Sequence, residues 1–223
     1  QQAINMDVRS RAELTAAMKK LTNIDNPNSV QQMKNWLADN GVETDTLGKK
    51  VVGELLKTAP PELKSVLALR QQLAKSSIKK YQAMENTVCA DGCIRGMFFF
   101  YGANRTGRYS SKYVQLQNLP QNHLADLALA RSLIKQGRYE DVDLLFDSVP
   151  GVLSELIRTA FVPKPGTRFI VADFSAIEAR VLAWFSGEKW RLDVFASHGK
   201  IYEASASAMF GVPIEEITKG SPF

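Results

Sequence analysis

The segment of this chain with the clearest chemical potential is Asp-Phe-Ser-Ala-Ile-Glu-Ala-Arg at positions 173–180. The apolar residues 169–172 before it predict a short strand, which would hold the Asp173 carboxylate at its carboxyl end, facing a cleft. Such a carboxylate suits a hard cation, because Mg2+ takes about one or two protein carboxylates together with phosphate oxygens. A purely structural interpretation also fits. Ser175 and Glu178 have the S-x-x-E spacing of a helix capping box, and Asp173 would then only add negative charge near the start of that helix.

Two basic segments form a second candidate site. A helix is predicted from Pro61 to about Met84, with an apolar seam on one face and basic residues on the other, including Lys75 and Lys79 one turn apart. Residues 103–120 have few helix formers and contain basic residues, hydroxyls and two tyrosines. A charged helix face is most often a solvated surface, and grouped basic side chains by themselves only hint at a polyanionic partner.

The composition is that of an ordinary globular protein. The 223 residues, 45% of them hydrophobic, suffice for one large or two small domains and exclude a fully disordered chain. No apolar run reaches membrane-spanning length, and no signal peptide follows Gln1, where the lack of a Met suggests a trimmed or internal start. The net charge of +5 is uneven, because residues 1–130 hold 17 basic and 11 acidic residues while residues 131–223 hold 11 and 12. The basic bias of the first part hints at a polyanionic partner.

The cysteine pattern gives little support to a metal site. Cys89 and Cys93 have C-x3-C spacing, and His123 and His198 lie far away in the sequence. A zinc site would need further thiols or histidines at suitable spacing. We interpret the two cysteines as free thiols in a reducing compartment, with zinc binding or a disulfide as the alternatives.

The elements around the candidate sites are predicted as a helical first part and a mixed second part. Up to residue 90, helices are expected at 11–21, from the Asn28-Ser29 N-cap to Gly41, at 47–56, and from Pro61 to Met84. After the Asp91-Gly92 turn, the pattern predicts a buried strand at 94–101, helices at 123–136 and 152–159, a turn at 163–166, a strand at 168–172 and a helix from Ser175.

The residues around Asp173 carry a family resemblance. Positions 171–183 resemble motif A of family A DNA polymerases, the bacterial polymerase I type, whose pattern is D-Y/F-S-x-I-E-x-R. Upstream, TGRYSS at 106–111 and LQNLP at 116–120 resemble the T-G-R-L-S-S and L-Q-N-I-P segment of that family. Three further similarities are shorter. LAKS at 73–76 resembles the connection between the thumb and the palm, and IRTAF at 157–161 resembles the segment that leads into motif A. GKIY at 199–202 and FGV at 210–212 resemble the first helices of the fingers. The first 25 residues are unassigned.

The resemblance implies an α+β fold with a helical thumb at 1–90, a palm at 91–185 with a small antiparallel sheet, and the start of the fingers at 186–223. The palm sheet is expected to pair the 94–101 strand with the 168–172 strand. Ala176 and Tyr202 stand where many members have Gln and His, which resembles the phage and prophage branch. The chain stops at Phe223, before the main fingers helix and the second palm aspartate of the family. It is therefore expected to be a thumb-and-palm fragment of a longer polymerase, inactive by itself.

The activity implied by the resemblance is DNA-directed DNA synthesis with two Mg2+ ions as cofactors. The implied partners are primer-template DNA and deoxynucleoside triphosphates, and no membrane is implied. The implied location is the cytoplasm of a bacterial or phage-infected cell. Asp173 and Glu178 are the implied catalytic residues; Asp173 and the backbone carbonyl of Phe174 are the implied metal ligands, and Glu178 would close the pocket under the sugar. The implied nucleotide-binding residues are Ser175, Ala176, Ile177, Glu178 and Tyr202, with Lys200 nearby. The implied DNA-binding residues are Lys75, Lys79, Arg108, Gln117, Asn118 and Arg180.

Two other classes of function stay open from the sequence. A non-catalytic module could bind primer-template DNA without chemistry. An RNA-binding protein with a basic loop would require the two motif matches to be coincidental.

Overall fold

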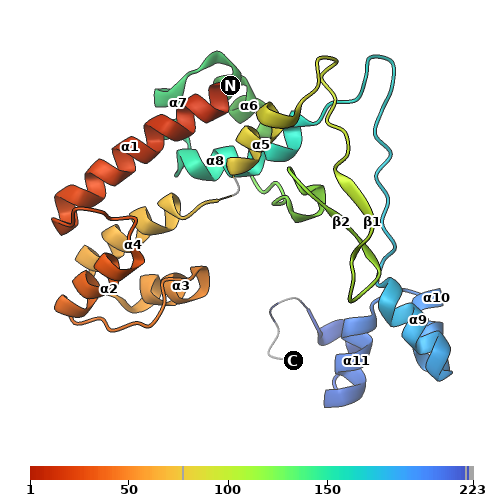
Figure 1. The fold of residues 1–223 in the computed structure, drawn as a ribbon. Helices are drawn as coiled ribbons and strands as arrows, with labels where there is room; N and C mark the ends of the chain where they lie inside the picture. Colours follow the sequence, from red (N-terminus) through yellow and green to blue (C-terminus); the bar gives the residue numbers. More distant parts are fainter. Residues whose placement is uncertain (77, 219, 221–223) are drawn as a thin grey trace. The chain divides into compact units, whose positions relative to one another are not determined.

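The computed structural model describes residues 1–76, 78–218 and 220, and the chain divides into two compact units, Gln1–Val162 and Pro163–Phe223. We call them unit 1 and unit 2. The described residues are mostly helical, with one two-stranded antiparallel sheet in unit 1 (Figure 1). The α+β expectation is confirmed. No helix among the described residues is long and apolar enough to cross a membrane.

Unit 1 begins with the predicted helical part. Its first five helices are α1 (Gln2–Thr22), α2 (Val30–Asp39), α3 (Lys49–Thr58), α4 (Pro61–Leu73) and α5 (Lys79–Thr87). The Ser29 side chain caps α2 by accepting a hydrogen bond from the Gln32 amide, as the sequence predicts. Pro61 occupies the first position of α4, where its missing N–H costs no hydrogen bond.

The single long helix expected from Pro61 to Met84 is wrong, because α4 ends at Leu73 and α5 begins at Lys79. In a continuous helix the Lys75 carbonyl would accept the Lys79 amide. The Lys75 carbonyl instead accepts a hydrogen bond from Arg11 of α1, and the Lys79 amide donates to Ser76. The carbonyl that a continuous helix would use is thus bound by a residue distant in the sequence, a partner that the local pattern does not reveal.

The sheet of unit 1 is a hairpin of β1 (Phe98–Ala103) and β2 (Arg108–Ser111). Phe98 lies opposite Ser111, and Ala103 lies opposite Arg108. Gly107, with φ of +66°, closes the turn, in which its amide donates to the Ala103 carbonyl. Part of the expected 94–101 strand is therefore confirmed as β1, but its expected burial is wrong, because the side chains of Phe98 and Phe100 are 56% and 77% exposed.

The expected pairing of that strand with residues 168–172 is wrong. The partner of β1 is β2, and residues 168–172 have no strand conformation. The observed pairing closes a loop of only a few residues, which costs far less chain entropy than one of about seventy residues. In unit 2 the side chains of Ile170 and Val171 are 85% and 92% exposed.

The rest of unit 1 is η1 (Leu116–Asn118), α6 (Leu127–Gln136), α7 (Tyr139–Leu145), α8 (Val149–Leu156) and η2 (Ile157–Ala160). The helix expected from His123 begins later, because Asp126 caps it by accepting the Leu129 amide. The largest cluster of buried side chains gathers around α8, including Val152, Leu153 and Leu156. Helix α1 packs against α4, α6 and α8 (Figure 1).

Unit 2 contains α9 (Ile177–Ser186), α10 (Lys189–Ala196), α11 (Ile201–Phe210) and η3 (Ile214–Glu216). The turn expected at 163–166 is present: the Thr167 amide donates to the Lys164 carbonyl, and Gly166 has φ of +77°. The buried hydrophobic side chains of its described residues are Ala183, Phe195, Ile201 and Ile217. Many of its other apolar side chains are exposed.

Candidate functional site

A basic groove in unit 1 brings together part of the predicted DNA-binding set. Two hollows of about 620 and 480 Å3 share Ser76, Asn118 and Pro120 in their linings. We call these two hollows the basic groove, since their linings contain five basic residues and no carboxylate: Lys49, Arg70, Lys75, Lys79 and Lys80. Lysines and arginines without acidic neighbours produce a positive potential that attracts a polyanion.

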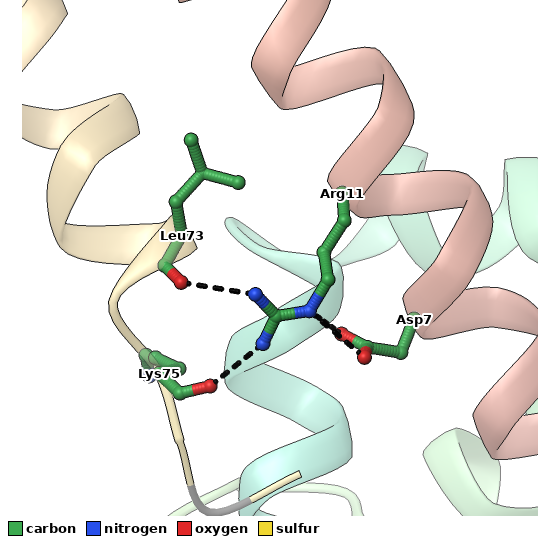
Figure 2. A network of polar contacts seen from close by, with 4 residues as sticks. All are labelled: Asp7, Arg11, Leu73 and Lys75. Carbon is green, nitrogen blue, oxygen red and sulfur yellow. Dashed lines mark hydrogen bonds and ion pairs between the residues drawn. The ribbon is translucent and has the colours of Figure 1, made fainter. Parts of the chain in front are cut away.

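One wall of the groove is the connector that follows α4, residues 74–76. Figure 2 shows how Arg11 of α1 holds it: Nη1 donates to the Leu73 carbonyl at 3.2 Å and Nη2 to the Lys75 carbonyl at 3.0 Å. Asp7, one turn before Arg11, accepts from Nε at 2.9 and 3.0 Å. The backbone that carries Lys75 is therefore tied to α1.

Lysine side chains from the connector and α5 supply the charge of this wall. The Lys75 ammonium lies 3.6 Å from the position that a Cβ on Gly151 would occupy, in the first turn of α8. Lys79 is exposed, and Lys80 donates to the Gln115 side chain at 3.1 Å. Among the described residues, none of these lysines has an ion-pair partner, so their charges are available to a ligand.

Arg70 is a groove residue that our sequence analysis did not select. Burial lowers the pKa of its guanidinium, and its buried Nε has no hydrogen-bond partner among the described residues. The sequence feature that could have identified Arg70 is its position five residues before Lys75, in a segment rich in basic residues. For Arg11 no local signal existed, because its partners lie more than sixty residues away in the sequence.

The loop around η1 contributes Asn118 and Pro120 to the lining of the groove. Gln117 accepts a hydrogen bond from the Ser111 hydroxyl at 2.6 Å. Arg158 of η2 donates to the carbonyls of Leu119 and Pro120 at 2.8 and 2.7 Å. These contacts hold the loop in place while the side chains of Gln117 and Asn118 stay exposed to solvent.

Arg108 lies elsewhere in unit 1. It begins β2 and is exposed, but it is not among the residues that line the basic groove. The structure therefore brings Lys75, Lys79 and Asn118 together, with Gln117 on the same loop as Asn118. It leaves Arg108 on the hairpin.

The motif A residues belong to unit 2. Asp173, Phe174 and Ser175 are exposed and precede α9 on a segment without strand or helix. Among the described residues, no three histidines, cysteines, aspartates or glutamates group closely enough to hold a metal ion. Asp173 thus offers a single carboxylate beside the Phe174 backbone carbonyl.

The expected capping box of Ser175 and Glu178 is wrong. Helix α9 begins at Ile177, and its N-cap residue is Ala176 with φ of +51°, whose side chain makes no capping hydrogen bond. The left-handed conformation of Ala176 leaves Ser175 one residue too early to act as the cap. The Ser175 carbonyl instead accepts from Arg180 Nε at 2.9 Å.

Other residues predicted to bind the nucleotide or the DNA lie on α9 and α11. Glu178, in the first turn of α9, lines an otherwise apolar hollow of about 470 Å3 with Ile177 and side chains of the next two turns. A carboxylate in the first turn is favoured by the helix dipole. Arg180 stacks over the Phe195 ring at 4.4 Å, and Tyr202 on α11 is exposed.

Comparison with known proteins identifies the family. The sequence matches DNA polymerase family A over residues 2–221. It is 55% identical over 221 residues to the DNA polymerase of Bacillus phage SP02, which covers 99% of this chain and 34% of the phage protein. It is 28% identical over 179 residues to the thermostable DNA polymerase I of Thermus aquaticus, covering 78% of this chain and 18% of that protein. DNA polymerase I of Chloroflexus aurantiacus is 35% identical over 114 residues, which are 51% of this chain and 9% of that protein.

These comparisons confirm the resemblance stated above, including its phage-like character, since the identity to the phage enzyme exceeds that to the two bacterial enzymes. The chain spans about a third of the length of the phage relative. The match runs through both units, from α1 to η3. The chain belongs to DNA polymerase family A.

Proposed function

We propose that this chain supplies the primer-template groove and one catalytic carboxylate of a DNA-directed DNA polymerase. In that reaction a primer 3′-hydroxyl attacks the α-phosphate of a deoxynucleoside triphosphate and releases pyrophosphate. The observation that carries the proposal is the basic groove, where five cationic side chains and an exposed amide meet without a carboxylate. Such a lining suits a duplex backbone bound without regard to sequence.

Phosphates and base edges would contact different parts of the groove. Lys75 and Lys79 would bind phosphates, and at Lys75 the amino-terminal turn of α8 favours an anion as well. Gln117 and Asn118 would donate to minor-groove acceptors, which look alike in all base pairs. Amides placed there would test the shape of the newly formed pair without reading its sequence. Arg108 and Arg180 would make further contacts to the DNA.

The oxygen ligands of this chain fit Mg2+ in their chemistry, but Asp173 supplies only one of the two aspartates that the resemblance implies for the metal site. Asp173 and the Phe174 carbonyl are hard oxygen ligands of the kind that Mg2+ prefers. In the reaction, two Mg2+ ions lower the pKa of the attacking hydroxyl and neutralise the charge on the leaving pyrophosphate. Asp173 would hold its part of this site from an exposed position, where nucleotide phosphates can complete the ligand set.

The sugar of the incoming nucleotide would lie over the start of α9. We assign Glu178 to the exclusion of a 2′-hydroxyl, and Ser175, Ala176, Ile177 and Tyr202 to contacts with the nucleotide. The division into a thumb at 1–90, a palm at 91–185 and the start of fingers at 186–223 belongs to the same proposal. We place the reaction in the cytoplasm, where a phage or bacterial genome is copied.

Titration of a primer-template duplex with the 223-residue chain at several salt concentrations tests the groove. Lys75→Ala combined with Lys79→Ala should weaken binding and reduce the slope of log K against log salt by about two, one for each lost phosphate contact. Lys57→Ala, an exposed lysine on α3 outside the groove, is the matched control and should leave the slope unchanged. Equal slopes for the groove variant and the wild type would refute the proposed groove.

The catalytic part needs a separate measurement. In the protein expressed from the whole reading frame that contains these residues, Asp173→Ala should abolish primer extension and leave duplex binding equal or slightly tighter. The 223-residue chain alone should show no detectable extension, because Asp173 would supply only one of the two aspartates that the family resemblance places on the metal ions. Extension by the Asp173→Ala protein would show that Asp173 is not catalytic, and duplex binding without extension by the unmodified protein would favour a non-catalytic module.

A further inference from the structure

The connector of residues 74–76 is held by a side chain that is remote in the sequence. Two nitrogens of the Arg11 guanidinium donate to carbonyls on either side of Ala74, those of Leu73 and Lys75 (Figure 2). Leu73 is the last residue of α4, and the carbonyls at a helix end carry partial negative charge. A guanidinium is well suited to this place because its planar fork can bind two acceptors at once.

Asp7 orients the fork. Its two carboxylate oxygens accept from the third guanidinium nitrogen, Nε, and its side chain is only 18% exposed. With Nε bound on one side, the two Nη groups face the connector (Figure 2). The Asp7 charge also neutralises Arg11, which does not line the basic groove.

We propose that Arg11, oriented by Asp7, is a positioning residue for DNA binding: it fixes the backbone of Lys75 so that the Lys75 ammonium stays in the basic groove beside α8. The proposal rests on the proposed function of that groove. Arg11 would not contact DNA. Its effect would pass through Lys75, because the Lys75 carbonyl is its acceptor and the Lys75 ammonium lies by the first turn of α8.

The first test measures duplex binding against salt for four forms of the 223-residue chain. Lys75→Ala should lower the salt slope by about one. Arg11→Ala should lower it by a similar amount, although Arg11 is outside the groove, and the double variant should equal Lys75→Ala. A slope unchanged by Arg11→Ala, or additive losses in the double variant, would overturn the proposal.

Two further variants separate positioning from charge and from general stability. Arg11→Lys keeps the charge but loses the fork, so it should behave like Arg11→Ala; a wild-type slope for Arg11→Lys would overturn the proposal. Arg9→Ala is the matched control, since Arg9 lies on the same helix and its ion pairs among the described residues are with Glu13 and Glu140. It should leave the salt slope unchanged, and a loss equal to that of Arg11→Ala would show that the effect is not specific to the connector.

The second test uses no DNA. The amides of Ala74 and Lys75 donate to Arg70 and Gln72, and their hydrogen exchange reports the order of the connector. Arg11→Ala should speed this exchange by about tenfold, the effect of losing hydrogen bonds to a charged group, whereas Arg9→Ala should not. Unchanged exchange in Arg11→Ala would overturn the positioning role even if DNA binds. Faster exchange in a chain that never binds DNA would support the role of Arg11 in ordering the connector and refute the proposed function instead.

Discussion

The two units differ in how they hold their candidate functional residues. In unit 1 the groove side chains stand on elements whose apolar faces form four buried clusters. In unit 2 the predicted metal ligand lies on an exposed segment between apolar side chains that are themselves exposed, such as Phe169 and Phe174. The groove is therefore supported by its own unit, while the motif A segment has little support from the described part of unit 2.

This difference shows that a segment can match a family motif closely in sequence without being packed into a core of its own unit. Motif A is the most specific pattern in the chain, yet Asp173 and Phe174, which carry its predicted metal ligands, are exposed. Large exposed apolar surfaces mark places where proteins make contacts, and on α9 they include Val181, Leu182 and Phe185 around Glu178. We expect unit 2 to depend on contacts beyond its own residues, and unit 1 to be self-sufficient.

Separating the units should have the largest effect. Residues 1–162 alone should unfold cooperatively in urea, because all four buried clusters lie there. Residues 163–223 alone should give no cooperative transition and should bind a dye that reports exposed apolar surface. Circular dichroism and dye fluorescence measure both properties. Cooperative unfolding of the second piece would remove the contrast between the units.

A matched pair of leucine substitutions in the whole chain should give the next largest effect. Leu153→Ala on α8 removes a fully buried side chain from the core of unit 1 and should lower the free energy of unfolding by about 2–5 kcal/mol. Leu182→Ala on α9 removes a side chain that is 62% exposed and should change it by less than about 0.5 kcal/mol. Urea titrations measure both values. A large loss for Leu182→Ala would show that unit 2 is packed against something in solution.

The substitution Glu178→Ala tests the proposed function of the motif A residues in unit 2. If Glu178 closes the sugar pocket, its loss should reduce discrimination against ribonucleotides by about 1–3 kcal/mol. Single-nucleotide incorporation by the protein from the whole reading frame, with Glu178→Gln as the control that keeps side-chain volume, measures this ratio. A variant that keeps its discrimination but melts at lower temperature would limit Glu178 to a role at the helix start.

The smallest expected effect is a pH dependence confined to unit 1. Arg9 joins Glu13 and Glu140, and the Tyr139 hydroxyl donates to Glu13 at 2.7 Å. The Arg9 hydrogen bond lowers the pKa of Glu13, and burial raises the pKa of Tyr139 to about 12.

These two shifts have opposite signs. The stability that comes from Glu13 is present above the ordinary carboxyl range and is lost as the pH falls through its lowered pKa. The stability that comes from Tyr139 is present below about pH 10, the ordinary phenol value, and is lost as the pH rises through about 12. Arg9→Ala should therefore flatten the acid side of the melting-temperature profile and Tyr139→Phe the alkaline side. Profiles parallel to that of the wild type would contradict this account.

Local patterns predicted the helical first part and several element boundaries. Ser29 caps α2 as its residue type predicts, and Pro61 starts α4. The turn at Gly166 likewise follows from residues that are adjacent in the chain. Such signals act within a few residues, so the amino-acid sequence contains them in full. The family was also evident from the sequence, because two motifs in the right order are specific without any coordinates.

The tertiary structure decided what depends on partners distant in the sequence. Arg11 binds backbone carbonyls at the end of α4, more than sixty residues away, Arg158 holds the loop of Gln117 and Asn118, and Arg70 joins the groove. The capping box failed because the backbone at Ala176 takes a left-handed turn that the S-x-x-E spacing does not reveal. The 168–172 strand was expected from its apolar residues, but a strand forms only where a neighbour accepts its hydrogen bonds, and apolar residues alone do not supply one.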